Sequence, residues 1–97
     1  MESLERINDI LKNCRKELDE KYKVKEIGIF GSYARGEQKK RSDVDILVEF
    51  DEVPDLFKFI ELERYLETLL KVKVDLVRKK SIRPELKDLI LKEVVYI

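Results

Sequence analysis

The chain has 97 residues, a length at which we expect one domain over residues 1–97 and no separate substrate-binding domain. Lysine and arginine together number 21, as do aspartate and glutamate, so the net charge is zero and no overall basic field attracts nucleic acid. The absence of histidine excludes imidazole from catalysis and from metal binding, so any metal must be held by carboxylates.

Charged residues and apolar residues each make up 43% of the chain, a balance that predicts a folded domain with a heavily charged surface. The single cysteine, Cys14, cannot form an internal disulfide and falls in an apolar helical pattern, which favours a reducing compartment. Without a run of about 18 apolar residues or a signal-type N-terminus, we expect a cytoplasmic protein. The scarcity of asparagine, glutamine and methionine beside many lysines and glutamates favours a thermophilic source.

Apolar residues at spacings of three and four predict an amphipathic helix over residues 4–21, with Ser3 as its N-cap. A β-rich run at residues 24–30 leads directly into Gly31 and Ser32, which predicts a turn from a strand into a helix. We expect that helix to be short, over residues 33–38, and to be followed by a polar loop.

Residues 44–50 predict a second strand, in which Asp45 and Glu49 share one face with Asp43 and the even-numbered apolar residues form the other. After this strand, the sequence predicts a helix opened by Pro54 and Asp55 and a strand around residues 72–78. A further helix is expected to begin at residues 81–84, with Leu86, Leu89 and Ile90 on its apolar side. A terminal strand is expected at residues 94–97. This order predicts an α/β (α+β) domain with one mixed β-sheet and helices mainly on one side.

Three features could carry chemistry, although each alone also fits a structural role. A glycine and a serine at the start of a helix, Gly31 and Ser32, offer backbone and hydroxyl donors to a phosphate, or simply form a turn. Asp43 and Asp45 point the same way about 6–7 Å apart along a strand, close enough to share metal ions, or they form a solvated face. Asp75, alone in an apolar strand, fits a solvent-facing acid.

The three features together indicate a metal-dependent site more strongly than each feature does alone. If the strands are neighbours, three carboxylates converge beside a phosphate-binding turn. Carboxylate oxygens without histidine or thiol ligands select Mg²⁺ or Mn²⁺, and Mg²⁺ completes its shell with water and substrate phosphates. The sequence therefore predicts phosphoryl-type transfer with two metal ions.

The segment GSYARGEQKKRSDVDILV, residues 31–48, resembles the signature of the minimal nucleotidyltransferase (MNT) group of the DNA polymerase beta superfamily. Residues 74–77 and 84–97 also resemble that group, so the likeness extends over essentially the whole chain. The resemblance implies the nucleotidyltransferase fold, a mixed sheet with flanking helices. It also implies transfer of a nucleoside monophosphate from a nucleoside triphosphate to a hydroxyl, with release of pyrophosphate.

The resemblance also implies roles for individual residues. Asp43 and Asp45 would bridge two Mg²⁺ ions, Asp75 would complete the shell of one of them, and Gly31 and Ser32 would hold the β- and γ-phosphates. The roles of other residues near this turn stay open. Arg35 could make a phosphate contact or a structural bond, and Ser42 could contact a phosphate or cap the loop. Tyr33 could stack or pack, and residues 39–41 could form a solvated loop or contact a nucleotide or a partner.

Relatives of this group commonly pair with a HEPN protein as antitoxin and toxin, so the resemblance implies adenylylation of tyrosine hydroxyls on a HEPN partner, with ATP as donor. One alternative is an antitoxin that binds nucleotide and neutralises the HEPN ribonuclease by occlusion. Another is a nucleotidyltransferase for RNA or small molecules that acts with a separate substrate-binding subunit. The apolar terminal run at residues 94–97 fits a core strand or a pairing edge, and the second would allow a homodimer.

Overall fold

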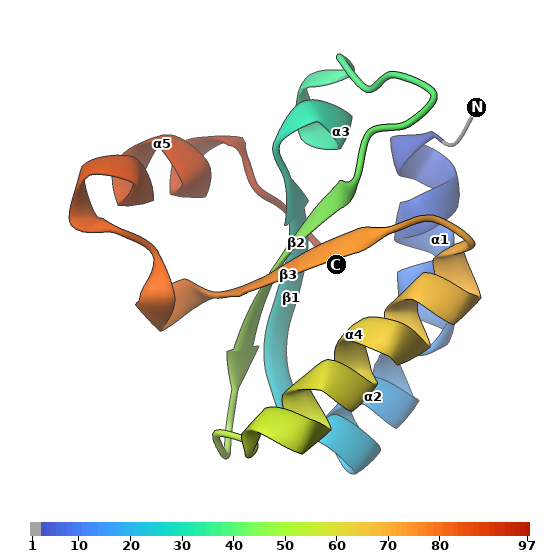
Figure 1. The fold of residues 1–97 in the computed structure, drawn as a ribbon, viewed down its shortest axis with the longest axis vertical. Coiled ribbons are helices and arrows are strands. Elements are labelled where there is room, and N and C mark those ends of the chain that lie inside the picture. Colours follow the sequence, from blue (N-terminus) through green and yellow to red (C-terminus); the bar gives the residue numbers. More distant parts are fainter. Residues whose placement is uncertain (1–2) are drawn as a thin grey trace.

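A computed structural model describes residues 3–97 and shows a four-stranded mixed sheet in the order β3-β2-β1-β4 (Figure 1). The central strands β1 (Val24–Phe30) and β2 (Val44–Phe50) pair antiparallel. β3 (Val74–Arg78) runs parallel to β2, and β4 (Val95–Tyr96) runs antiparallel to β1. The predicted mixed sheet is therefore confirmed.

One face of the sheet is covered by α1 (Leu4–Asn13), α2 (Arg15–Tyr22) and α4 (Leu56–Leu70), which lie together on the same side in Figure 1. Their apolar stripes meet the alternate residues of the strands and bury them from water. The fully buried members of this core include Ile7, Leu11, Leu18, Leu62, Leu66 and Leu70 from the helices and Val44, Ile46 and Val48 from β2.

Side-chain caps begin two of these helices where the sequence predicts. The Ser3 hydroxyl accepts a hydrogen bond from the Arg6 N–H at 3.2 Å, and the Asp55 carboxylate accepts one from the Lys58 N–H at 2.8 Å. Each cap satisfies a backbone donor that has no acceptor within the helix, which fixes the residue at which the helix starts.

The single helix expected over residues 4–21 is wrong, because the chain breaks it at Cys14 into α1 and α2. The Cys14 thiol donates to the Leu11 carbonyl at 3.6 Å, the acceptor that an unbroken helix would offer to the Arg15 amide. Arg15 instead ties the start of α2 to the sheet, since its guanidinium donates to the Lys25 carbonyl at 2.6 Å. The local side-chain bond competes with the helical ladder and divides it.

The short helix expected over residues 33–38 is displaced and shortened, since α3 covers Ser32–Arg35. Gly36 follows with φ of 70° and ends the helix in the left-handed conformation that glycine adopts at little cost. The chain is thereby released into the loop that leads to β2.

The last helix, α5 (Pro84–Glu93), starts at the predicted proline but does not bury the predicted apolar side. Leu86 is 45% exposed and Leu89 is 64% exposed, while Ile90 is half-buried. A 3₁₀ turn, η1 (Lys79–Ser81), leads the chain away from the core, and α5 lies on the side of the sheet opposite to the other long helices (Figure 1). Within residues 3–97, no helix is long and apolar enough to cross a membrane.

The terminal strand expected at residues 94–97 forms as β4, an edge strand of the sheet. Ile97 packs against the core and its N–H donates to the Ile27 carbonyl at 2.9 Å, whereas Tyr96 is 42% exposed. This terminal segment thus packs one residue against the core and exposes the next, and within residues 3–97 the outer backbone edge of β4 has no partner strand. A homodimer through that edge stays a prediction.

Two leucine truncations test this division between the core and the unpartnered helix. Leu66→Ala in α4 should lower the free energy of unfolding by about 2–5 kcal/mol, because it leaves a cavity in a fully buried site. Leu89→Ala in α5 is the matched control and should change it by less than about 0.5 kcal/mol. Urea denaturation of both variants measures the difference, and equal losses would contradict the fold described here.

Candidate active site

Parallel pairing of β2 and β3 places two carboxylates side by side. Asp45, the second residue of β2, lies opposite Asp75, the second residue of β3. Neighbouring strands are about 4.8 Å apart, and side chains alternate between faces, so both carboxylates point away from the core face that holds Val44 and Ile46. The structure therefore brings these two predicted site residues together.

The proximity of the acids shows in the ionisation of Asp45. Its pKa is raised to about 6, first because the half-buried carboxyl is desolvated and then because Asp75 repels its charge and accepts a hydrogen bond from its protonated form. Asp43 adds further repulsion, and the Arg35 guanidinium opposes it only in part. The site thus carries more negative charge than its own cations neutralise.

Asp43 differs from Asp45 in its exposure to solvent. It is exposed, at the end of the loop that enters β2, whereas Asp45 is half-buried. Within residues 3–97, no three histidine, cysteine, aspartate or glutamate side chains are gathered closely enough to hold a metal ion by themselves. Mg²⁺ is usually held through one or two carboxylates plus substrate phosphates and water, and the charge-crowded Asp45 and Asp75 pair fits that role.

Gly31 lies directly against the Asp45 carboxylate. Its φ of 75° and ψ of −150° fall in a region that is essentially restricted to glycine. A Cβ added to Gly31 would collide with the carboxylate of Asp45, so a side chain is excluded by space as well as by conformation. The Asp45 carboxylate occupies the space that a Cβ would need, which explains why a glycine follows β1 at this point.

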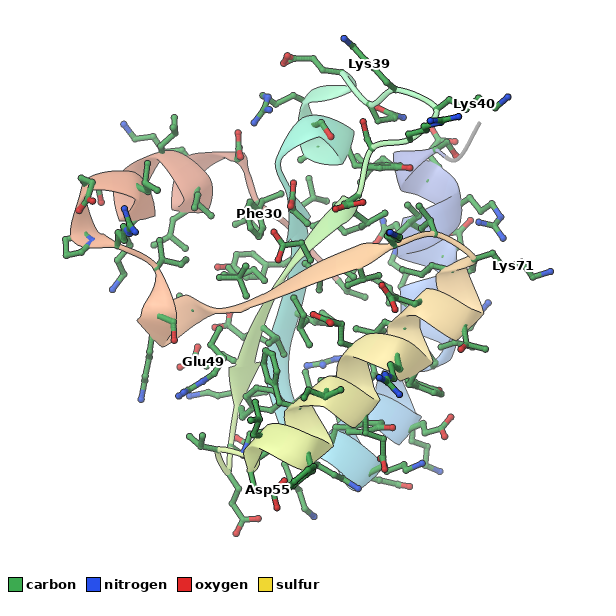
Figure 2. All side chains as sticks on the ribbon, viewed as in Figure 1. Phe30, Lys39, Lys40, Glu49, Asp55 and Lys71 are labelled. Carbon is green, nitrogen blue, oxygen red and sulfur yellow. The ribbon has the colours of Figure 1, made fainter. Side chains whose placement is uncertain are left out.

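The loop between α3 and β2 holds Ser42 as a cap in this structure. Its hydroxyl oxygen accepts a hydrogen bond from the Lys39 N–H at 2.8 Å, and its own N–H donates to the Lys39 carbonyl at 3.0 Å. Lys39, Lys40 and Arg41 are exposed, and the two labelled lysines lie along the outer loop in Figure 2. The Tyr33 ring is buried in the core, so it packs.

Arg35 makes ionic contacts that tie the turn to other parts of the chain. Its Nε lies 2.9 Å from a Glu37 carboxylate oxygen, and its Nη1 lies 3.2 and 3.0 Å from the two carboxylate oxygens of Glu93. Glu93 also accepts a hydrogen bond from the Gly31 N–H at 3.0 Å. Sequence reasoning missed both glutamates, and the signal for Glu93 lies in the pairing of β4 with β1.

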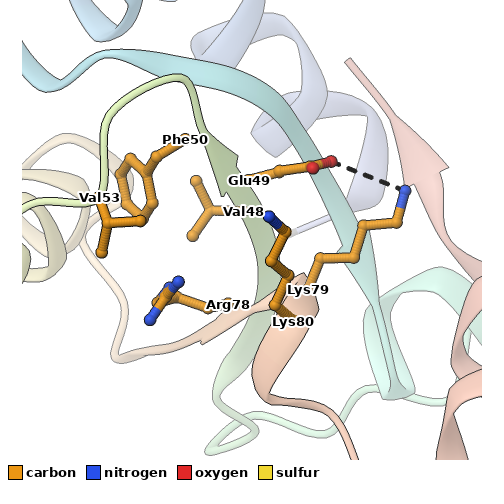
Figure 3. Close-up of a pocket in the computed structure, with 7 residues that line it drawn as sticks. All are labelled: Val48, Glu49, Phe50, Val53, Arg78, Lys79 and Lys80. Atoms are coloured by element: carbon orange, nitrogen blue, oxygen red, sulfur yellow. Dashed lines mark ion pairs between the residues drawn. The ribbon is translucent and has the colours of Figure 1, made fainter.

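Two hollows near the strands differ in their relation to the acids. Lys40, Arg41, Ser42, Asp43, Val72 and Lys73 line a hollow of about 340 Å³ that adjoins the site. The hollow in Figure 3 measures about 20 Å³, room for about one water molecule, and lies at the opposite end of β2. There Lys79 Nζ lies 3.8 Å from Glu49 and 3.3 Å from Glu26, an ion-pair cluster separate from the aspartates.

Ionisation of Asp45 should destabilise the metal-free protein. The folded state raises the pKa from the ordinary 3.8 to about 6, so the penalty is fully present above about pH 6 and absent below about pH 4. Asp45→Asn should therefore be more stable than the wild type near pH 8, and this advantage should vanish near pH 4. Urea denaturation with a chelator present measures both values. Asp51→Asn, beyond the far end of β2, is the matched control, and equal stability of Asp45→Asn and wild type near pH 8 would contradict the prediction.

Known proteins resemble the chain over nearly its whole length. Residues 11–97 match the family described as Nucleotidyltransferase domain. The chain is 57% identical over 97 residues to the protein adenylyltransferase MntA of Thermococcus cleftensis, a match that covers all of this chain and 98% of that protein.

Solved structures share the fold. A crystal structure of a toxin-antitoxin with AMP-PNP matches with a TM-score of 0.73 and 31% identity, over 93% of this chain and 70% of that chain. A structure of a tri-AMPylated Shewanella oneidensis HEPN toxin in complex with an MNT antitoxin matches with a TM-score of 0.64 and 28% identity, over 93% of this chain and 66% of that chain. The paired aspartates and the glycine turn lie within residues 11–97, the part of the chain that matches the family. The chain therefore belongs to the nucleotidyltransferase-domain family and is an enzyme of that class.

Proposed function

We propose that the protein transfers AMP from ATP to a tyrosine hydroxyl on a HEPN-domain partner and thereby acts as an antitoxin. The observation that carries the proposal is the carboxylate pair of Asp45 and Asp75, held directly beside the side-chain-free turn at Gly31. Two features of the site match what AMP transfer requires: excess negative charge that calls for divalent cations, and a glycine turn that leads into a helix directly beside the acids.

The relatives support the choice of donor and acceptor. The similar Thermococcus cleftensis protein is named a protein adenylyltransferase. One structural neighbour was crystallised with AMP-PNP, and another contains an AMPylated HEPN toxin beside an MNT antitoxin. ATP as donor and a HEPN protein as acceptor therefore agree with what is named or bound in those proteins.

We assign the residues as follows for that reaction. Gly31 and Ser32 hold the terminal phosphates of ATP, and Asp43, Asp45 and Asp75 hold Mg²⁺, with Mn²⁺ as a substitute and two ions in the complete site. Bound Mg²⁺ would supply charge neutralisation at the triphosphate and a lowered pKa for the attacking hydroxyl.

The bonds formed and broken in AMP transfer require the acceptor to bring a hydroxyl group to the α-phosphate. The hydroxyl oxygen forms a bond to the α-phosphorus, the bond from that phosphorus to the bridging oxygen breaks, pyrophosphate leaves, and the hydroxyl proton passes to solvent water. Asp75 and Asp43 are both exposed, so a tyrosine carried on another protein can reach the carboxylates from solvent. Arg35 is already paired with two carboxylates, which favours its structural role over a phosphate contact.

Label transfer tests the proposal directly. ATP labelled in the α-phosphate is added with Mg²⁺ to lysate of the source organism, together with wild-type protein, Asp43→Asn or the matched control Asp51→Asn. We expect one protein band to take up label with wild type and with Asp51→Asn, and at least about 100-fold less with Asp43→Asn, because loss of a metal-holding carboxylate removes charge stabilisation in the transition state. Label in RNA or small molecules instead would identify a different acceptor.

A second measurement separates chemistry from occlusion. The labelled partner is purified, and complex formation and ribonuclease inhibition are measured with wild type and with Asp43→Asn. We expect Asp43→Asn to bind the partner with unchanged affinity and to lose inhibition, because AMP transfer and not contact silences the toxin. Retained inhibition by Asp43→Asn would favour the occlusion mechanism.

A further inference from the structure

Glu93 links the last helix to the turn beside the aspartates. Its side chain is only 18% exposed, and it accepts three hydrogen bonds: one from the Gly31 N–H at 3.0 Å and two from Arg35 Nη1 at 3.2 and 3.0 Å. Glu93 is the final residue of α5, a helix that buries none of its own residues. The glutamate is therefore a principal polar attachment of this helix to the rest of the described chain.

Strand pairing fixes where Glu93 stands. β4 pairs with β1 so that Val95 lies opposite Ile29 and Tyr96 lies opposite Gly28, and the Ile97 N–H continues the ladder to the Ile27 carbonyl. Glu93 is the last residue of α5 and only Val94 separates it from β4, so the pairing of β4 with β1 brings the end of α5 close to the end of β1. Its contact with the turn is made by the side chain, through the hydrogen bond from the Gly31 N–H at 3.0 Å and the two from Arg35.

The residue that Glu93 holds is the one that touches Asp45. Gly31 has so little space that a Cβ would collide with the Asp45 carboxylate, so a small shift of this backbone changes the room beside the acids. Arg35, the second partner of Glu93, is also near enough to act electrostatically on Asp45. One carboxylate therefore controls both the position of the turn and the position of a nearby cation.

We infer that Glu93 is a positioning residue that clamps the Gly31 backbone and Arg35 in the arrangement that receives the triphosphate of the nucleotide. This role rests on the proposed nucleotide site at Gly31 and Ser32. Two hydrogen bonds from one guanidinium nitrogen and one from a backbone amide make Glu93 a charge-assisted anchor, stronger than a neutral hydrogen bond. In a competing role, Glu93 blocks donors that the phosphates need, and removal of its carboxylate would then strengthen nucleotide binding.

Nucleotide binding by variants at position 93 tests the role. Glu93→Ala removes the anchor and should weaken binding of AMP-PNP with Mg²⁺ by about 10- to 100-fold. Glu93→Gln keeps an acceptor for the Gly31 N–H and should restore binding to within about threefold of wild type. In the labelling reaction, the KM for ATP should rise in parallel for Glu93→Ala while kcat falls by less than about threefold, whereas simple loss of folded enzyme would lower kcat and leave KM unchanged.

A measurement without nucleotide tests the contact itself. The chain has three glycines, so glycine-selective ¹⁵N labelling gives three assignable backbone amide signals. The Gly31 signal should move, and its amide should exchange faster with solvent, in Glu93→Ala and not in Glu93→Gln. If Glu93→Ala does not fold, Glu93→Asp replaces it, because the shorter side chain keeps the charge and withdraws it from Gly31.

Glu85→Ala is the matched control, since Glu85 is exposed in the first turn of the same helix. It should leave AMP-PNP binding and the Gly31 signal unchanged. If Glu93→Ala binds AMP-PNP as tightly as the wild type, or more tightly, the positioning role is overturned and the proposed function stays in place. Failure of wild type itself to bind AMP-PNP overturns the proposed function and the positioning role together, while the glycine spectra still report whether the clamp exists.

Discussion

The parallel register of β2 and β3 holds two carboxylates together against their repulsion, and the site depends on this constraint. Asp45 and Asp75 are neighbours only because β2 and β3 are held in register, and the opposite faces of those strands are buried in the helical core. Packing on one side of the sheet therefore holds together charges on the other side that would separate in water. A cation that binds only the folded protein would relieve the repulsion and stabilise the fold, so ligand affinity and fold stability are linked here.

The glycine turn is the second part of the site, and it is assembled from both ends of the chain. β1 delivers Gly31 to the edge of the acids, and the strand that follows α5 delivers Glu93 to Gly31. Neither segment makes the site alone. The exposed leucines of α5 fit this picture, since the helix is held by its final residue and by the strand after it more than by an apolar face.

Local patterns were sufficient to predict the strands, the cap at Ser3, the opening of α4 at Asp55 and the mixed sheet, because each depends on spacing within a few residues. The break at Cys14 was missed because it depends on one thiol bonding to a carbonyl three residues earlier. The prediction that α5 buries its apolar side was wrong, because periodicity does not show which side of the sheet a helix packs on. Asp45 and Asp75 could be placed together only on the assumption that their strands are neighbours, and Glu93 required the register of a strand only two residues long.

The pairing of β4 with β1 also sets when this site can form during folding. The helices α1 and α2 and the strands β1 and β2 come first in the chain, so they can begin to pack before residues 93–97 are in place. The acceptor of the Gly31 N–H is residue 93, and the strand that fixes it follows at residues 95–96. A chain in which residues 93–97 have not yet docked would therefore have an unanchored turn beside its acids, so the completed site is the last part of the domain to form.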